Sequence, residues 1–115
     1  MSCHYCAERP LHPKLEAGQV AYTQHQYAEA FQLLSLLAYQ GYVTAQCLLG
    51  SMFQLGLGIE RDSAAAKQWY QQAGLQGCAL SFHNLATIYE VDDQNPAMAQ
   101  YYRQQAKDMG CELME

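Results

Sequence analysis

Residues 45–77 decide the fold, and they read AQCLLGSMFQLGLGIERDSAAAKQWYQQAGLQG. Apolar side chains recur in this stretch at intervals of three and four residues, in two sets: Ala45, Leu49, Met52 and Phe53, and then Ala66, Trp69, Tyr70 and Ala73. This spacing gathers each set on one face of an α-helix, whereas a β-strand would alternate apolar and polar residues. Gly56 and Gly58 lie between the two sets and predict a turn. The stretch therefore predicts two antiparallel helices that pack as a hairpin.

The same pattern recurs elsewhere in the chain of 115 residues. A shift of 36 residues places Leu49 on Leu85. A shift of 33 residues places Trp69 on Tyr102. A period of this size is typical of stacked helical hairpins, each of which needs its neighbours to bury its apolar face. We therefore predict an all-α fold of about three antiparallel helix hairpins.

Small and polar residues at fixed places explain how each hairpin is built. Gly50 and Ala66 are expected at the contact between paired helices, because small side chains allow a close approach. Asp62 and Asn95 precede the second helices of two units, where their side chains can accept hydrogen bonds from exposed amides. Glycine ends each unit, where a left-handed conformation favours it, at Gly41, Gly77 and Gly110.

These positions resemble the signature of a Sel1-like repeat. The matching residues are Ala45, Leu49, Gly50, Phe53, Gly56, Gly58, Ile59, Asp62, Ala66, Trp69, Ala73 and Gly77. Residues 81–110 resemble a degraded copy, with Ala86 where the pattern favours glycine, and residues 15–41 look more like a tetratricopeptide repeat with a shorter turn. The resemblance implies a short right-handed α-solenoid over residues 14–110. Residues 1–13 form an N-terminal segment that need not be ordered, and residues 111–115 form a tail.

For function, the resemblance implies an adaptor that binds a protein or peptide on a concave surface lined by the first helix of each hairpin. Polar, weakly charged side chains on those helices are the predicted contacts: Gln19, Tyr22, Cys47, Ser51, Gln54, His83, Thr87 and Glu90. Such a stripe suits an extended peptide held by hydrogen bonds. The alternative is that these side chains are simply solvated.

Charge and hydropathy exclude several classes of partner. The chain has 6 Lys and Arg against 11 Asp and Glu, a formal net charge of −5, which repels nucleic acid and anionic membranes. No stretch approaches the roughly 20 apolar residues of a membrane span, and the start has no continuous apolar run of a secretory signal. We expect a cytoplasmic protein whose five cysteines are thiols.

The sequence predicts neither catalysis nor a cofactor. Its most chemical element is the pair Cys3 and Cys6, with His12 nearby. Thiolates two residues apart can share a zinc ion, yet a closed structural site needs four ligands and a second pair is missing. A small metal or thiol site on these residues is therefore only an alternative hypothesis. Asp92 and Asp93 fall in a predicted connection, where we expect them to solvate the turn.

The C-terminal hairpin suggests a further alternative, a structural role by self-association. Terminal repeats usually present a polar outer face. This end instead has several apolar residues: Met98, Tyr101, Met109, Leu113 and Met114. Either the tail folds back over them or two copies of the chain meet there as a homodimer.

Overall fold

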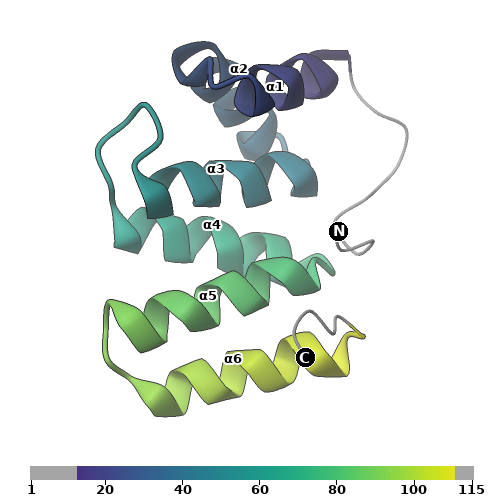
Figure 1. Cartoon of the computed structure of the whole chain (residues 1–115). Helices are drawn as coiled ribbons and strands as arrows, with labels where there is room; N and C mark the ends of the chain where they lie inside the picture. Colours follow the sequence, from purple (N-terminus) through teal and green to yellow (C-terminus); the bar gives the residue numbers. More distant parts are fainter. Residues whose placement is uncertain (1–12, 111–115) are drawn as a thin grey trace.

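The computed structural model describes residues 13–110 and consists there of α-helices without strands. The six helices are α1 (Pro13–Thr23), α2 (Tyr27–Tyr39), α3 (Val43–Leu55), α4 (Ser63–Leu75), α5 (Ala79–Val91) and α6 (Pro96–Asp108). They form three hairpins, α1/α2, α3/α4 and α5/α6, which we call hairpins 1, 2 and 3 and which are stacked in chain order (Figure 1). The predicted fold class is confirmed.

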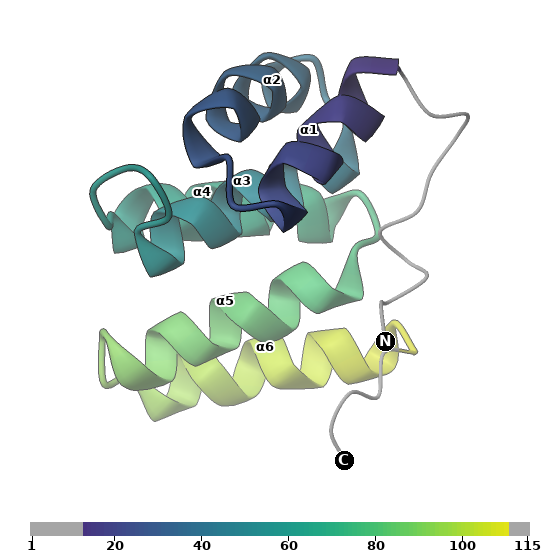
Figure 2. The same ribbon diagram turned by 45° about the horizontal axis from the view of Figure 1, so that its top comes forward.

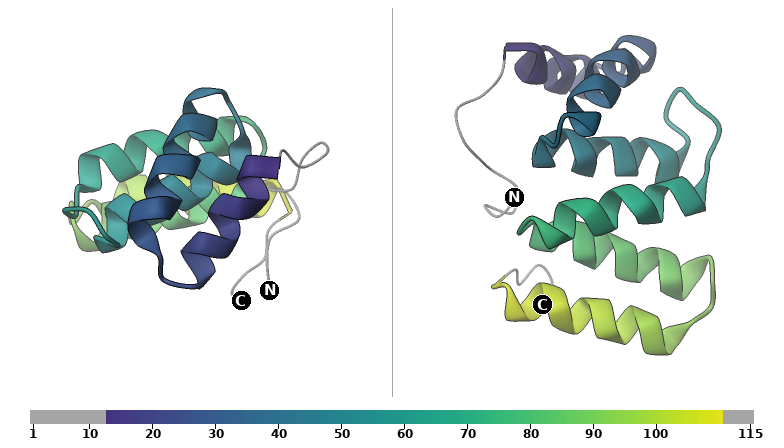
Figure 3. Two further views of the ribbon diagram at one scale, coloured as in Figure 1. Left: turned by 90° about the horizontal axis from the view of Figure 1, so that it is seen from above. Right: turned by 180° about the vertical axis from the view of Figure 1, so that it is seen from behind.

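The stacking is clear from other directions as well. In Figure 2 hairpin 1 lies across α3 and α4, with hairpin 3 below them. Figure 3 shows the same order from behind, and its view from above shows that hairpin 1 is rotated relative to the hairpins beneath it. The principal packing of each helix is against the helices before and after it in the chain. None of the helices within residues 13–110 has the length and apolar character needed to cross a bilayer.

The predicted period is confirmed to the residue. α3 begins at Val43 and α5 at Ala79, which is a shift of 36 residues (79 − 43). α4 begins at Ser63 and α6 at Pro96, a shift of 33 residues (96 − 63). The difference of three residues lies in the connections, because residues 56–62 join α3 to α4 whereas only residues 92–95 join α5 to α6.

The helix ends use the predicted residues. The Asp62 side chain accepts a hydrogen bond from the backbone N of Ala65 at 3.1 Å, and the Asn95 side chain accepts one from the backbone N of Met98 at 3.2 Å. The repeat-ending glycines have positive φ angles: +96° at Gly41, +109° at Gly77 and +93° at Gly110. Local sequence therefore sets where these helices begin and end.

The close approach predicted at Gly50 and Ala66 is also confirmed. Both residues are buried, and a Cβ atom added to Gly50 would lie 2.8 Å from Cε1 of Tyr70, inside van der Waals contact. Tyr70 of α4 is 0% exposed, so its ring has little room to move away. The absence of a side chain at residue 50 is what allows the two helices of hairpin 2 to pack around this ring.

Ion pairs join hairpin 2 to hairpin 3, and they correct one expectation. Asp92 accepts hydrogen bonds from Nη2 of Arg61 at 2.7 Å and from Oγ of Ser63 at 2.5 Å. Lys67 Nζ lies 2.5 Å from Asp93 Oδ2. The Ser63 hydrogen bond, followed by the bonds and charge of Arg61, lowers the pKa of Asp92 below its usual value. The two carboxylates therefore connect hairpins instead of only solvating a turn.

The outer side of α6 is less apolar than the sequence suggests. Met98 and Met109 are partly buried and pack against the core of hairpin 3, while Tyr101 is 53% exposed. Leu113 and Met114 lie outside the described residues. Self-association through this hairpin stays a prediction, with less exposed apolar surface behind it than the sequence indicated.

Candidate functional site

The eight predicted contact residues lie on the first helices of the three hairpins, and we call the surface that they form the first-helix face. They are Gln19 and Tyr22 on α1, Cys47, Ser51 and Gln54 on α3, and His83, Thr87 and Glu90 on α5. Seven are half-buried and Glu90 is exposed. Half-burial matters here because such side chains are held in place by neighbours and still reach solvent.

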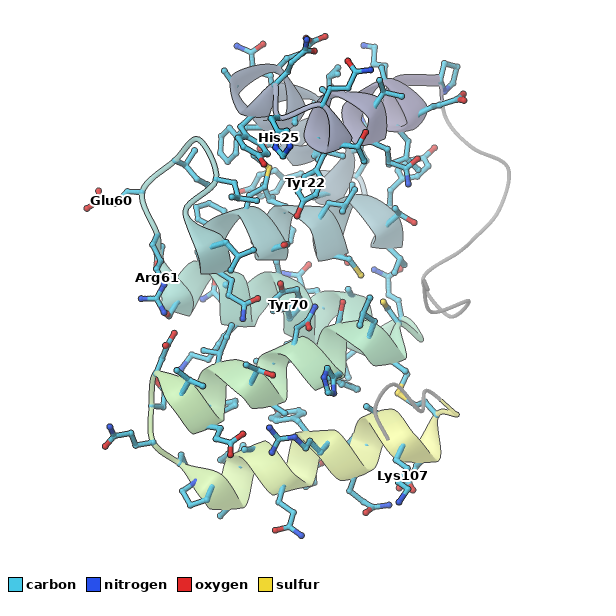
Figure 4. The ribbon with its side chains drawn as sticks, viewed as in Figure 1. Tyr22, His25, Glu60, Arg61, Tyr70 and Lys107 are labelled. Atoms are coloured by element: carbon cyan, nitrogen blue, oxygen red, sulfur yellow. The ribbon has the colours of Figure 1, made fainter. Side chains whose placement is uncertain are left out.

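Hairpins 1 and 2 meet on this face through two hydroxyl groups. Tyr22 Oη and Ser51 Oγ are 2.8 Å apart, a hydrogen bond between α1 and α3. Figure 4 shows the Tyr22 side chain between hairpin 1 and α3. The Tyr22 ring also makes an edge-to-face contact with Tyr27, with ring centroids 6.1 Å apart. The structure therefore brings together two of the predicted residues that are 29 positions apart in the chain.

A third hydroxyl comes from the second helix of hairpin 2. Tyr70 Oη donates a hydrogen bond to Oε1 of Gln54 at 2.7 Å. Burial raises the pKa of Tyr70 well above its usual value, although hydrogen bonds with Ser51 and Asn84 act in the opposite direction. Its hydroxyl therefore remains a protonated donor throughout the physiological range of pH. The sequence analysis did not assign Tyr70 to the site, because Tyr70 belongs to a second helix, α4. Gly50 could have indicated it, since a glycine at a buried helix position leaves room for a large side chain from the partner helix.

His83 on α5 is the one histidine among the eight residues of the first-helix face. Burial first, and then the charge of Arg103, lower the pKa of His83 below its usual value, so its imidazole is neutral at pH 7. Thr87 Oγ1 donates to the backbone carbonyl of His83 at 3.3 Å. Glu90 pairs with Arg103 of α6, which offsets its charge. Arg103 was not predicted, because its role depends on how α6 packs beside α5.

Cys47 lies where hairpins 2 and 3 meet. Its Sγ is 2.7 Å from Oγ of Ser81 and 2.9 Å from Sγ of Cys78, the residue just before α5. Cys78 is disulfide-bonded, so the expectation that all five cysteines are thiols is wrong for this residue.

The alternative metal hypothesis concerns Cys3, Cys6 and His12, which lie outside the described residues. Within residues 13–110, no group of three or more His, Cys, Asp or Glu side chains is arranged to hold a metal ion.

Comparison with known families agrees with the hairpins. A family model described as Sel1 repeat matches residues 15–42, 43–78 and 83–111. The first of these segments had looked more like a tetratricopeptide repeat, and the match corrects that interpretation. No curated protein was found to match the chain. Because the three matches cover most of its length, the chain belongs to the Sel1 repeat family, whose tetratricopeptide-like solenoids are generally protein–protein interaction modules.

Proposed function

We propose that this protein is a non-catalytic, cytoplasmic adaptor that captures an extended segment of a partner protein on the first-helix face. One observation carries the proposal: polar side chains of α1 and α3 are held by hydrogen bonds between helices, and the predicted residues of α5 lie on the next first helix of the stack. The Tyr22–Ser51 hydrogen bond joins α1 to α3, and the Tyr70–Gln54 hydrogen bond fixes the amide of Gln54. Side chains held in this way lose less freedom on binding, which favours capture of a ligand.

The chemistry of the face indicates what the partner segment is like. Since Tyr70 donates to the carbonyl oxygen of Gln54, the amide NH₂ of Gln54 is the group oriented for another acceptor, such as a peptide carbonyl. The half-buried hydroxyls of Ser51 and Thr87 are bonded to Tyr22 and to the His83 carbonyl, and each keeps a lone pair that can accept a hydrogen bond from a peptide amide. An extended peptide presents alternating carbonyl and amide groups that match such a row.

Charge narrows the class of segment further. The net charge of −5 disfavours an acidic partner, steers basic segments toward the surface and does not oppose neutral ones. The neutral imidazole of His83 adds a donor and an acceptor without adding a positive charge. We therefore propose a neutral or basic segment as the bound class.

The absence of catalysis is part of the same proposal. Nucleophilic catalysis requires a hydroxyl or thiol activated by an adjacent base. On the first-helix face, the hydroxyl of Ser51 is bonded to a tyrosine hydroxyl and the thiol of Cys47 contacts the hydroxyl of Ser81. These partners suit binding better than proton abstraction.

A peptide selection tests the proposal. A displayed library of random 12-residue peptides is selected against the purified chain, and the dissociation constants of the recovered peptides are measured by fluorescence anisotropy. Ser51→Arg and Thr87→Arg place a bulky charge on the face and are expected to weaken binding at least about tenfold, equal to about 1.4 kcal/mol.

Gln68→Arg is the matched control, because Gln68 is an exposed residue of α4 outside the first-helix face. It should leave both the dissociation constant and the melting temperature unchanged, and circular dichroism should show that the Ser51→Arg and Thr87→Arg chains are still folded at the temperature of the binding assay. Peptides that bind the Ser51→Arg and Thr87→Arg chains as tightly as the unmodified chain would contradict the proposed surface.

A further inference from the structure

Two exposed apolar side chains lie where the first helices of hairpins 2 and 3 end. Leu55, the last residue of α3, is 61% exposed, and Val91, the last residue of α5, is 64% exposed. They occupy equivalent places in the repeat, 36 residues apart (91 − 55). Each directly follows a residue of the first-helix face, Gln54 or Glu90. The face therefore ends, on both helices, in an exposed apolar side chain.

One guanidinium group ties the ends of these two helices together. Arg61, in the α3–α4 connection, donates from Nε to the backbone carbonyl of Gln54 at 3.0 Å and from Nη2 to both carboxylate oxygens of Asp92 at 2.7 Å. Gln54 precedes Leu55, and Asp92 follows Val91. Because all of these bonds come from one planar group, the two helix ends that carry the apolar side chains are held close together.

The connection that carries Arg61 is itself held in place. Leu57 and Ile59 are partly buried against the core that hairpin 1 shares with hairpin 2, and Gly58 lies against the Cβ of Tyr27. A single exposed leucine needs no explanation, since much of any protein surface is apolar. Two apolar side chains on ends that one braced connection holds are different, because they lose little freedom when a ligand covers them.

The charges at this end of the stack favour a basic ligand. We call it the connection end, because the α3–α4 and α5–α6 connections lie there (Figure 1). Its three cations are already paired, as Arg61 with Asp92, Lys67 with Asp93 and Arg103 with Glu90. Within residues 13–110, the exposed carboxylates of Glu29, Glu60 and Asp62 have no such ion pair, and the Glu60 side chain points away from the ribbon (Figure 4).

The helix ends add to this negative field. The C-terminus of an α-helix is the negative end of its dipole and attracts cations. Neither α3 nor α5 has a basic residue in its last turn. A lysine or arginine of a ligand is therefore favoured beside the same ends that present Leu55 and Val91.

We propose that Leu55 and Val91 are the apolar anchor of the first-helix face, and that the captured segment has apolar side chains flanked by lysine or arginine. The inference rests on the proposed function and adds to it the sequence class of the segment. Apolar side chains of the segment cover Leu55 and Val91, which removes apolar surface from water. The flanking basic side chains face the unpaired carboxylates of the connection end.

Peptides from the displayed library of 12-residue sequences test the inference. Those that bind the purified chain are sequenced, and the strongest is synthesised with a fluorescent label. We expect leucine, isoleucine, valine or phenylalanine next to lysine or arginine. Leu55→Ser and Val91→Ser should each raise its dissociation constant about fivefold, because partial covering of an apolar side chain yields part of the free energy of full burial.

Two variants at the opposite end of the stack are matched controls. Leu75→Ser makes the same change at the last residue of α4, which is 75% exposed, and should leave the dissociation constant unchanged. Glu60→Gln should weaken binding about twofold at low salt and less at high salt, whereas Asp108→Asn, at the last residue of α6, should have no effect. Circular dichroism checks that all four chains are folded at the temperature of the assay.

A double-mutant cycle locates the contact. Serine in place of the apolar residue of the peptide should weaken its binding to the unmodified chain, and should cost much less against the Leu55→Ser chain, because the contact is already lost. The proposal is overturned if the two losses simply add, or if the Leu55→Ser and Val91→Ser chains bind as tightly as the unmodified chain.

The outcomes separate this inference from the proposed function. If Ser51→Arg weakens binding and neither Leu55→Ser nor Val91→Ser does, capture on the face stands and the apolar anchor is refuted. If the serine variants weaken binding and Ser51→Arg does not, the anchor stands and the wider face is refuted. A library that yields no binding peptide refutes both.

A second copy of the chain is the competing occupant, and sedimentation equilibrium tests it. The proposal expects the same mass for the unmodified, Leu55→Ser and Leu75→Ser chains. A dimer of the unmodified chain that Leu55→Ser dissociates and Leu75→Ser leaves intact would assign the apolar side chains to self-association and overturn the proposal.

Discussion

Gly58→Ala is expected to weaken the stack of hairpins by acting at the contact between the α3–α4 connection and hairpin 1. Gly58 has a φ of +76°, and an added Cβ would overlap the Cβ of Tyr27 and lie 3.5 Å from its backbone carbon. Tyr27 is the first residue of α2, so neither of these atoms is the mobile end of a side chain. The strained backbone costs about 1–2 kcal/mol, and the overlap about 1–3 kcal/mol. Together they predict a loss of about 2–5 kcal/mol in the free energy of unfolding.

Gly77→Ala is the matched control for this substitution. Gly77 also has a positive φ, +109°, and an added Cβ would have no atom within 4 Å. Only the backbone cost of about 1–2 kcal/mol applies there. The entropy that alanine removes from the unfolded chain is similar in both variants, so the difference between them isolates the Tyr27 contact.

Urea unfolding followed by circular dichroism at 222 nm measures both free energies. Gly58→Ala should be the less stable variant by about 1–3 kcal/mol. Equal stabilities, within about 0.5 kcal/mol, would refute the reasoning that the connection is pressed against hairpin 1.

Three further substitutions test other contacts. Gly50→Leu should lower the free energy of unfolding in urea by at least about 1–3 kcal/mol, because the new side chain collides with the ring of Tyr70; a neutral result would contradict the packing of hairpin 2. Tyr70→Phe should cost about 1 kcal/mol at pH 7 through the lost bond to Gln54. Its pKa is raised in the folded chain, so folding opposes its ionisation and stability falls above about pH 10; the Phe variant should lose less stability there than the unmodified chain. Asp92→Asn should lower the melting temperature at pH 7. The pKa of Asp92 is lowered in the folded chain, chiefly by the hydrogen bond from Ser63, so ionised Asp92 contributes to stability above pH 3.8 and this contribution is lost as the pH falls through the pKa of the folded state. The melting temperatures of the two chains should therefore converge in acid. An equal difference in melting temperature at all pH values would count against the ion pair.

The helices and their ends could be predicted because their determinants are local. Asp62 and Asn95 cap the helices that follow them, and a cap depends only on the next three residues. The position of Gly50 was predictable for a related reason, since its partner lies on the adjacent helix of the same hairpin. Spacing along one hairpin was therefore enough to place these residues.

The contacts between hairpins could not be predicted in the same way. Arg61 and Asp92 are 31 residues apart, and their ion pair depends on the rotation of one hairpin against the next, which no periodicity encodes. The approach of Cys47 to Cys78 depends on that same rotation. Gln94 has a φ of +50° in the shortened α5–α6 connection, a conformation that its residue type does not suggest.

Because each helix relies mainly on its neighbours along the chain, no extensive packing within residues 13–110 closes the stack into a ring. Pulling on its two ends would load the hairpin boundaries in series, and the weakest boundary would open before the others. A single-molecule trace should then show stepwise lengthening in units of one repeat instead of one abrupt rupture.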